Sequence, residues 1–178
     1  MTDYSWFSSS HLAEAFSFIF VRGYTPEKLV THLGGQVGDF TWMTFDESIN
    51  DGDERYIAVT GIGDWALIAL YNSWLAANDD FTVPLSAGTR VVSLYRLDIK
   101  DLEDFRWIED GDIRFGHWAQ EGYSEEVPAE LTELMKEIGD DHDLYRGPGL
   151  RLIEHLTGVR LTPEIFDDAR YLAGTLPS

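Results

Sequence analysis

The stretch EDFRWIEDGDIRFGHW, residues 103–118, contains the clearest turn signal in the sequence. Its centre is Asp110-Gly111, a pair favoured in two-residue hairpin turns because both central positions need positive φ. Residues with high β propensity flank the turn on both sides. We therefore expect an antiparallel hairpin. Its expected cross-strand pairs are Ile108 with Ile113, Trp107 with Arg114, and Glu109 with Asp112.

Other segments favour strands connected in the same way. Residues 55–62 and 64–72 are apolar runs that meet at a glycine-rich turn, which indicates two antiparallel strands. Residues 39–45 alternate and contain many β formers, and residues 88–98 are strongly β-branched. Strands joined by short turns, without a regular alternation with helices, favour an antiparallel sheet.

Helix signals occur near the N-terminus. The segment Thr25-Pro26-Glu27 predicts a helix start, since Thr is a good N-cap, Pro suits the first helical position and Glu favours the positive end. Gly34 predicts the end of this helix. A further helix is expected after residues 8–10, from apolar positions at helical spacing. These positions are Leu12, Phe16, Ile19 and Phe20.

The last part of the chain changes from strand patterns to helix patterns. Residues 128–139 are amphipathic at helical spacing, residues 147–158 predict a second helix that ends at Gly158, and Thr162-Pro163-Glu164 predicts a further helix start. The sequence therefore predicts an α+β fold with a single domain over residues 1–178. We expect a mostly antiparallel sheet of about five to seven strands, with the N-terminal and C-terminal helices packed on one of its faces.

The composition excludes several classes of protein. Thirteen basic and 32 acidic residues give a net charge of −19, which repels nucleic acid and anionic lipid and attracts basic partners. The absence of cysteine excludes disulfides, thiolate chemistry and cysteine-based zinc sites. No apolar run approaches the roughly 18 residues of a membrane span, and the N-terminus lacks the pattern of a secretory leader. We therefore expect a cytoplasmic protein that binds neither nucleic acid nor membrane.

The acidic residues are unevenly distributed along the chain. Residues 98–143 carry a net charge of −12 and residues 39–56 carry −5, whereas the other segments are close to neutral. Adaptation to high salt predicts an acidic surface all round, so this concentration favours a local acidic face. The sequence leaves open whether the two acidic segments lie side by side.

Catalytic and metal-binding motifs are mostly absent. The sequence contains no phosphate loop, dinucleotide fingerprint, nucleophile elbow or paired-histidine metal motif. Residues 139–143, GDDHD, have ligands suited to a hard divalent ion, but a solvated loop is the simpler interpretation. Glu109 and Asp112 could provide a general acid if they were close and dry, yet a hairpin tip is normally wet. We therefore predict no catalytic residue, no metal and no cofactor.

Four segments together resemble a known family. They are RGYTPEKLVTHLGG (22–35), GDWALIALYNSW (63–74), SAGTRVVSLYR (86–96) and LTGVRLTPEIF (156–166). In order and spacing they are similar to an uncharacterised actinobacterial, Streptomyces-type family with a domain of unknown function. The resemblance spans about residues 6–172. It implies no activity, so it assigns no catalytic residue.

These observations predict a non-enzymatic acidic module that binds a basic protein, such as an immunity protein or antitoxin that neutralises a basic toxin or nuclease. Acidic clusters would steer the encounter, and aromatic side chains would anchor it. The predicted partner-binding residues are Glu103, Asp104, Trp107, Glu109, Asp110, Asp112, Trp118, Tyr123, Glu125 and Glu126.

Two alternatives remain open. One is a carboxylate-dependent hydrolase that uses His117 or residues 140–143. The other is a small-ligand or carbohydrate-binding domain that uses exposed tryptophans. The chain has six tryptophans, most of them in apolar strand patterns, which favours core packing over a stacking groove.

Overall fold

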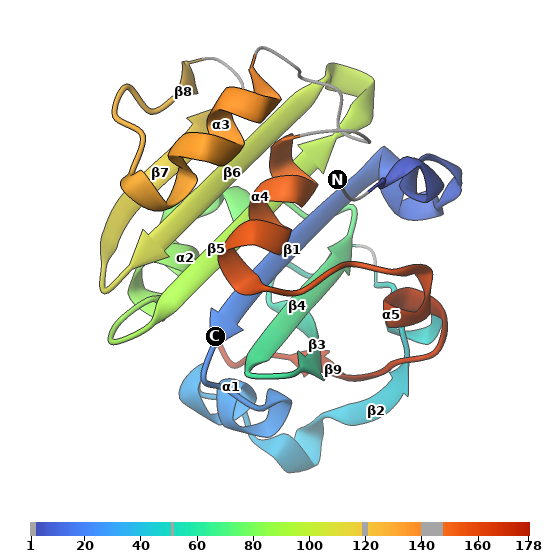
Figure 1. Cartoon of the computed structure of the whole chain (residues 1–178). Helices are drawn as coiled ribbons and strands as arrows, with labels where there is room; N and C mark the ends of the chain where they lie inside the picture. Colours follow the sequence, from blue (N-terminus) through green and yellow to red (C-terminus); the bar gives the residue numbers. More distant parts are fainter. Residues whose placement is uncertain (1–2, 51, 119–120, 140–147) are drawn as a thin grey trace.

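The computed structural model describes residues 3–50, 52–118, 121–139 and 148–178. Its centre is a nine-stranded sheet with the order β2-β9-β3-β4-β1-β5-β6-β7-β8, in which every neighbouring pair is antiparallel (Figure 1). The strands are β1 (Ala15–Arg22), β2 (Thr41–Thr44), β3 (Tyr56–Ile62), β4 (Trp65–Tyr71), β5 (Arg90–Leu97), β6 (Leu102–Glu109), β7 (Asp112–Trp118), β8 (Gly122–Tyr123) and β9 (Arg170–Thr175). The predicted α+β class is confirmed, with more strands than expected.

Helices cover both faces of this sheet rather than one. They are α1 (Pro26–His32), α2 (Asp79–Leu85), α3 (Thr132–Ile138), α4 (Pro148–Thr157) and α5 (Pro163–Asp167). In Figure 1, α3 and α4 lie in front of the sheet and α2 lies behind it. The side chains of β6 support this arrangement, because Glu103 and Arg106 are an odd number of residues apart and therefore point to opposite faces of the sheet. Glu103 accepts a hydrogen bond from the Gly149 backbone of α4, whereas Arg106 pairs with Asp79 of α2. In the part of the chain that the structure describes, no helix is both long and apolar enough to cross a membrane.

Strand β1 corrects the predicted N-terminal helix. Leu12 lies in a short 3-10 turn, His11–Glu14, and the apolar run after it forms β1, between β4 and β5. Of the eight residues of β1, only Arg22 is exposed. A strand covered on both faces is apolar at nearly every position. It therefore loses the alternation typical of half-buried strands, and its apolar residues can match helical spacing by chance.

An aromatic cluster packs against the face of β1 that carries Phe16 and Phe18. The Phe18 ring stacks on Phe16 at 4.3 Å and on Phe166 of α5 at 5.5 Å between centroids. Phe7, in the 3-10 turn Ser5–Ser9, contacts Phe16 edge-on at 5.2 Å. These contacts hold the N-terminal turn and α5 on the central strand.

The 103–118 hairpin forms as predicted, with one local difference. Asp110 and Gly111 have φ values of 48° and 82°, as the expected turn requires. Ile108 pairs with Ile113 and Glu109 with Asp112, but Trp107 pairs with Phe115 rather than with Arg114. A β-bulge causes the difference, because the register shifts between Trp107 and Ile108 and leaves Arg114 as the extra residue.

The sequence predicted helix α1 but not strand β9. Helix α1 begins as expected, since the Thr25 hydroxyl accepts a hydrogen bond from the Lys28 N–H at 3.2 Å and Pro26 occupies the first turn. Strand β9 was not predicted, although it inserts between β2 and β3. Only its three buried residues, Tyr171–Ala173, carry an apolar signal, which is too short to identify a strand by periodicity.

We expect Phe18→Ala to destabilise the protein by about 3–5 kcal/mol, because it removes a buried ring and leaves a cavity between β1 and α5. The measurement is the free energy of unfolding in urea. Trp42→Ala is the control, since Trp42 is 41% exposed and its loss is expected to cost much less. Equal losses of stability in the two variants would contradict this description of the core.

Candidate functional site

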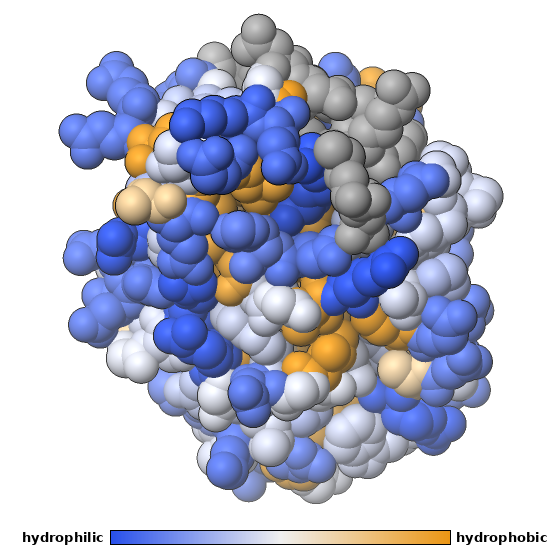
Figure 2. All heavy atoms as spheres, viewed as in Figure 1, coloured by the Kyte–Doolittle hydropathy of each residue, from blue (hydrophilic) through white to orange (hydrophobic). Residues whose placement is uncertain are grey.

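The two acidic segments of the sequence lie at opposite edges of the sheet. Strands β6, β7 and β8 form one edge, and β2, from the second acidic segment, forms the other. The described residues 98–139 include 13 acidic and four basic residues. We call these residues, which comprise β6–β8 and continue through α3, the acidic edge. Figure 2 shows mainly hydrophilic side chains over α3 and its neighbours, interrupted by small hydrophobic areas.

Two of the predicted binding acids have structural roles in the hairpin. The Asp110 carboxylate accepts a hydrogen bond from the Gly88 N–H at 2.9 Å, which attaches the turn to the loop after α2. Glu109 forms an ion pair with Arg90 and a longer one with Arg114, at 3.5 Å. These arginines offset the repulsion between Glu109 and Asp112, which lie directly opposite one another.

Trp107 is a core residue and not an exposed anchor. Its side chain is 2% exposed, with the Arg90 guanidinium 4.8 Å and the Arg114 guanidinium 5.5 Å from its ring centroid. Arg90 also donates hydrogen bonds to Glu130 at 2.9 and 3.0 Å and to the Leu156 carbonyl, near the end of α4, at 3.0 Å. One guanidinium thus connects the hairpin, the turn before α3 and the last turn of α4.

Glu103 is also buried, with 6% of its surface exposed. Burial raises the pKa of this carboxyl to about 7, although the Arg96 guanidinium lies 3.6 Å away. The carboxyl lies under the first turn of α4, where it accepts a hydrogen bond from the Gly149 backbone. Glu103 and Trp107 therefore do not belong to an exposed binding surface, because both side chains are buried.

The remaining predicted residues are more accessible. Asp112, Glu125 and Glu126 are exposed, and Asp104 is half-buried. Trp118 is half-buried beneath the Arg106 guanidinium, 5.7 Å from its ring centroid, and Tyr123 stacks on Phe115 at 5.8 Å. The two aromatic side chains therefore present only part of their surface to a partner.

Sequence reasoning missed three apolar side chains on the acidic edge. Ile99, Ile113 and Val127 are 89%, 39% and 40% exposed. Ile99 and Ile113 each lie between two charged residues in the sequence, and Val127 directly follows Glu125 and Glu126, so that contrast was the available signal. Exposed apolar residues next to carboxylates resemble the mixture found in protein interfaces.

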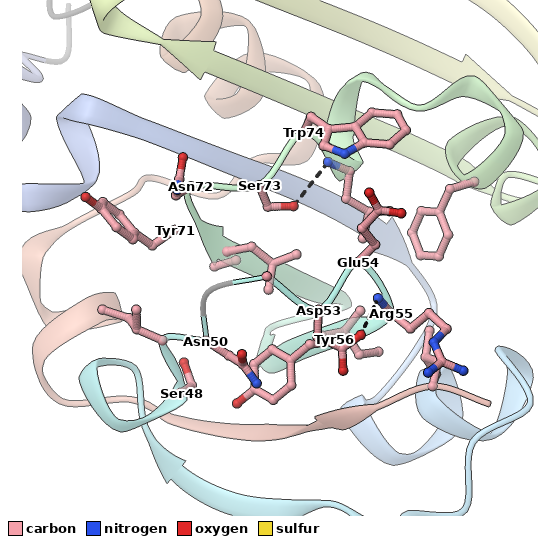
Figure 3. A pocket seen from close by; sticks show the side chains of 18 of the residues that line it. Ser48, Asn50, Asp53, Glu54, Arg55, Tyr56, Tyr71, Asn72, Ser73 and Trp74 are labelled. Carbon is pink, nitrogen blue, oxygen red and sulfur yellow. Dashed lines mark hydrogen bonds between the residues drawn. The ribbon is translucent and has the colours of Figure 1, made fainter. Parts of the chain in front are cut away.

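A cavity of about 700 Å³ forms a second candidate site, well separated in sequence from the acidic edge. Residues 48–50 and 52–57, the turn after β4 and the C-terminal Leu176 and Pro177 line it. In Figure 3, Trp74 and Glu54 lie on one side of this space and Asn50 and Tyr56 on the other. Trp74 is 50% exposed, so the predicted core packing of the tryptophans does not extend to this residue.

Metal-binding side chains do not converge in the described part of the chain. Residues 3–50, 52–118, 121–139 and 148–178 contain no group of three His, Asp or Glu side chains able to hold an ion. His117, a candidate of the hydrolase alternative, is half-buried and its ring lies 4.5 Å from that of Tyr123. Residues 140–143, considered as a metal loop, lie outside the described residues.

The fold and these sites define an antiparallel α+β protein with an acidic edge and a cavity lined by polar and aromatic side chains. The model of a family described as "Family of unknown function (DUF6461)" matches residues 1–178, and the chain belongs to this family. No curated protein and no solved structure matches the chain. The resemblance to an uncharacterised family is confirmed, and it assigns no activity.

We expect Arg90→Lys to destabilise the protein by about 2–3 kcal/mol, because an ammonium cannot replace hydrogen bonds to three separate groups. Arg114→Lys is the matched control. Its guanidinium also lies over Trp107, but the side chain is 49% exposed and its ion pair is longer, so the expected loss is below about 1 kcal/mol. Unfolding in urea measures both. A loss for Arg114→Lys as large as for Arg90→Lys would contradict the role of Arg90.

Glu103 should make stability depend on pH. Its pKa is higher in the folded protein than the ordinary value of 4.5, so the folded state binds more protons between pH 4.5 and 7. Stability is therefore expected to fall as pH rises through this range, and Glu103→Gln should remove that contribution. The difference in unfolding free energy between wild type and Glu103→Gln, measured from pH 4 to pH 8, isolates the effect. Glu126→Gln, at an exposed site, should give a flat difference.

Proposed function

We propose that this protein is a non-enzymatic module that binds a basic protein through its acidic edge. In the form that we favour, the partner is a basic toxin or nuclease, and the chain neutralises it as an immunity protein or antitoxin. The proposal includes a cytoplasmic location and an actinobacterial source. The use of ten arginines and only three lysines fits the GC-rich genome of such a source.

A single observation carries the proposal: exposed carboxylates and two exposed apolar side chains, Ile113 and Val127, occur in the part of the acidic edge formed by β7, β8 and the residues that follow. Of the five large hydrophobic side chains exposed in the described part of the chain, Ile113 lies on β7 and Val127 lies after β8, whereas Ile99 lies at the other end of β6, in the turn after β5. Protein interfaces commonly combine apolar contact area with a polar rim. The apolar side chains would supply contact area, and the carboxylates around them would select a basic partner.

The unpaired carboxylates support electrostatic steering. Asp112, Glu125 and Glu126 are exposed and make no ion pair with another described residue. Their field is therefore not cancelled locally, unlike that of Glu109. A concentration of one charge at one edge raises the rate of encounter with an oppositely charged partner and makes that rate dependent on salt.

The hydrolase alternative has less support. The acid whose pKa is raised to about 7 is Glu103, which is 6% exposed and does not line the cavity. A catalytic acid must reach the substrate atom that it protonates. Glu103 lies under α4 instead, where its hydrogen bond to Gly149 supports a structural role.

Reversal of the unpaired charges tests the proposal. The triple variant Asp112→Lys, Glu125→Lys, Glu126→Lys should bind a captured basic partner at least about tenfold more weakly, mainly through slower association. Surface plasmon resonance at low salt and at about threefold higher salt measures the rates. The wild-type association rate should fall as salt rises, whereas the rate of the variant should change little.

The control carries the same change of net charge elsewhere. Asp39→Lys, Asp64→Lys, Asp167→Lys reverses three exposed acids outside the acidic edge. Its association rate should stay closer to that of the wild type. Equal losses in both triple variants would show that only net charge matters, and unchanged kinetics in the first variant would exclude the acidic edge as the docking surface.

A further inference from the structure

We propose that the cavity beside Trp74 binds a neutral sugar, whose ring stacks on the indole and whose hydroxyl groups bond to the polar wall. The cavity volume of about 700 Å³ falls within the range of about 300–1,000 Å³ typical of small-ligand sites. This site is separate from the acidic edge, so the proposal does not depend on the function proposed above.

The segment that carries Trp74 is attached to β1 by hydrogen bonds. The Ser17 hydroxyl of β1 donates to the Ser73 carbonyl at 2.6 Å and accepts from the Ala76 N–H at 3.0 Å. The Asn72 N–H donates to the Ala15 carbonyl at 3.0 Å. Trp74 nevertheless remains 50% exposed. An exposed indole on a fixed turn can stack against a ligand. Because the turn is already ordered, binding costs the protein little conformational entropy.

The cavity is also lined by polar side chains that make no hydrogen bonds within the described part of the fold, on the side of Trp74 and on the side opposite it. The side chains of Asn50, Glu54 and Arg55 make no hydrogen bond with another described residue. Asp53 differs, since its carboxylate accepts from the Arg55 N–H at 3.0 Å and from the Thr175 hydroxyl at 2.8 Å. These bonds lower the pKa of Asp53 and hold the chain next to Glu54 and Arg55 in place.

The chemistry of the lining selects against other ligand classes. An anion would meet Asp53 and Glu54 with only Arg55 to offset them, in a chain of net charge −19. A long aliphatic ligand would remove the amide and charged groups of the wall from water without giving them hydrogen bonds. A sugar provides both an apolar ring face for Trp74 and hydroxyl groups that donate to Glu54 and accept from Asn50 and Arg55.

Titration with neutral sugars tests the proposal. The probes are glucose, galactose, N-acetylglucosamine, maltose, cellobiose and chitobiose, each up to about 10 mM. Tryptophan fluorescence and isothermal titration calorimetry follow binding. At least one sugar should bind the wild type saturably, and Trp74→Ala should weaken that binding by at least about tenfold. Asn50→Ala should weaken it by a smaller factor.

Trp42→Ala is the matched control, because Trp42 is similarly exposed, at 41%, but does not line the cavity. Its affinity for the same sugar should equal that of the wild type, and circular dichroism should show all three variants folded. The absence of binding by every sugar, or equal binding by wild type and Trp74→Ala, would overturn the proposal. Saturable binding of inorganic phosphate or laurate in place of any sugar would overturn the proposed ligand chemistry.

Discussion

The burial of strand β1 on both faces is the constraint on which the rest of the structure depends. A central strand with a single exposed residue requires cover from helices in front of the sheet and behind it. That cover leaves little of either sheet face to solvent. The surfaces available for binding are therefore at the margins of the sheet: the acidic edge, and the cavity beside the turn after β4.

A second interaction gives the acidic edge its shape. Arg90 joins the hairpin, the turn before α3 and the end of α4 through one guanidinium, with the buried Trp107 ring beneath it. Part of the negative charge of the edge is thereby used for stability. The carboxylates left free, such as Asp112 and Glu126, are the ones that can act on a partner. The total charge in the sequence therefore overstates the charge available for binding.

The sequence could predict those features of the fold that depend on local chemistry. The Asp110-Gly111 turn, the Thr25 cap of α1 and the α+β class follow from short-range preferences, and all are present in the structure. Strand β1 was misassigned because burial on two faces removes alternation. The cavity could not be predicted, since it brings together residues 48–50 and 52–57, the Trp74 turn and the C-terminus, which only the folded chain makes neighbours.

The central claim is that a partner docks on the acidic edge. Hydrogen–deuterium exchange of the protein alone and in complex with its captured partner tests it most directly, because exchange reports protection along the whole backbone. If a partner docks there, protection on binding is greatest over residues 112–118 and 121–127, with no change at β2 on the opposite edge. Protection confined to β2, or absent from residues 112–118 and 121–127, would contradict docking on the acidic edge.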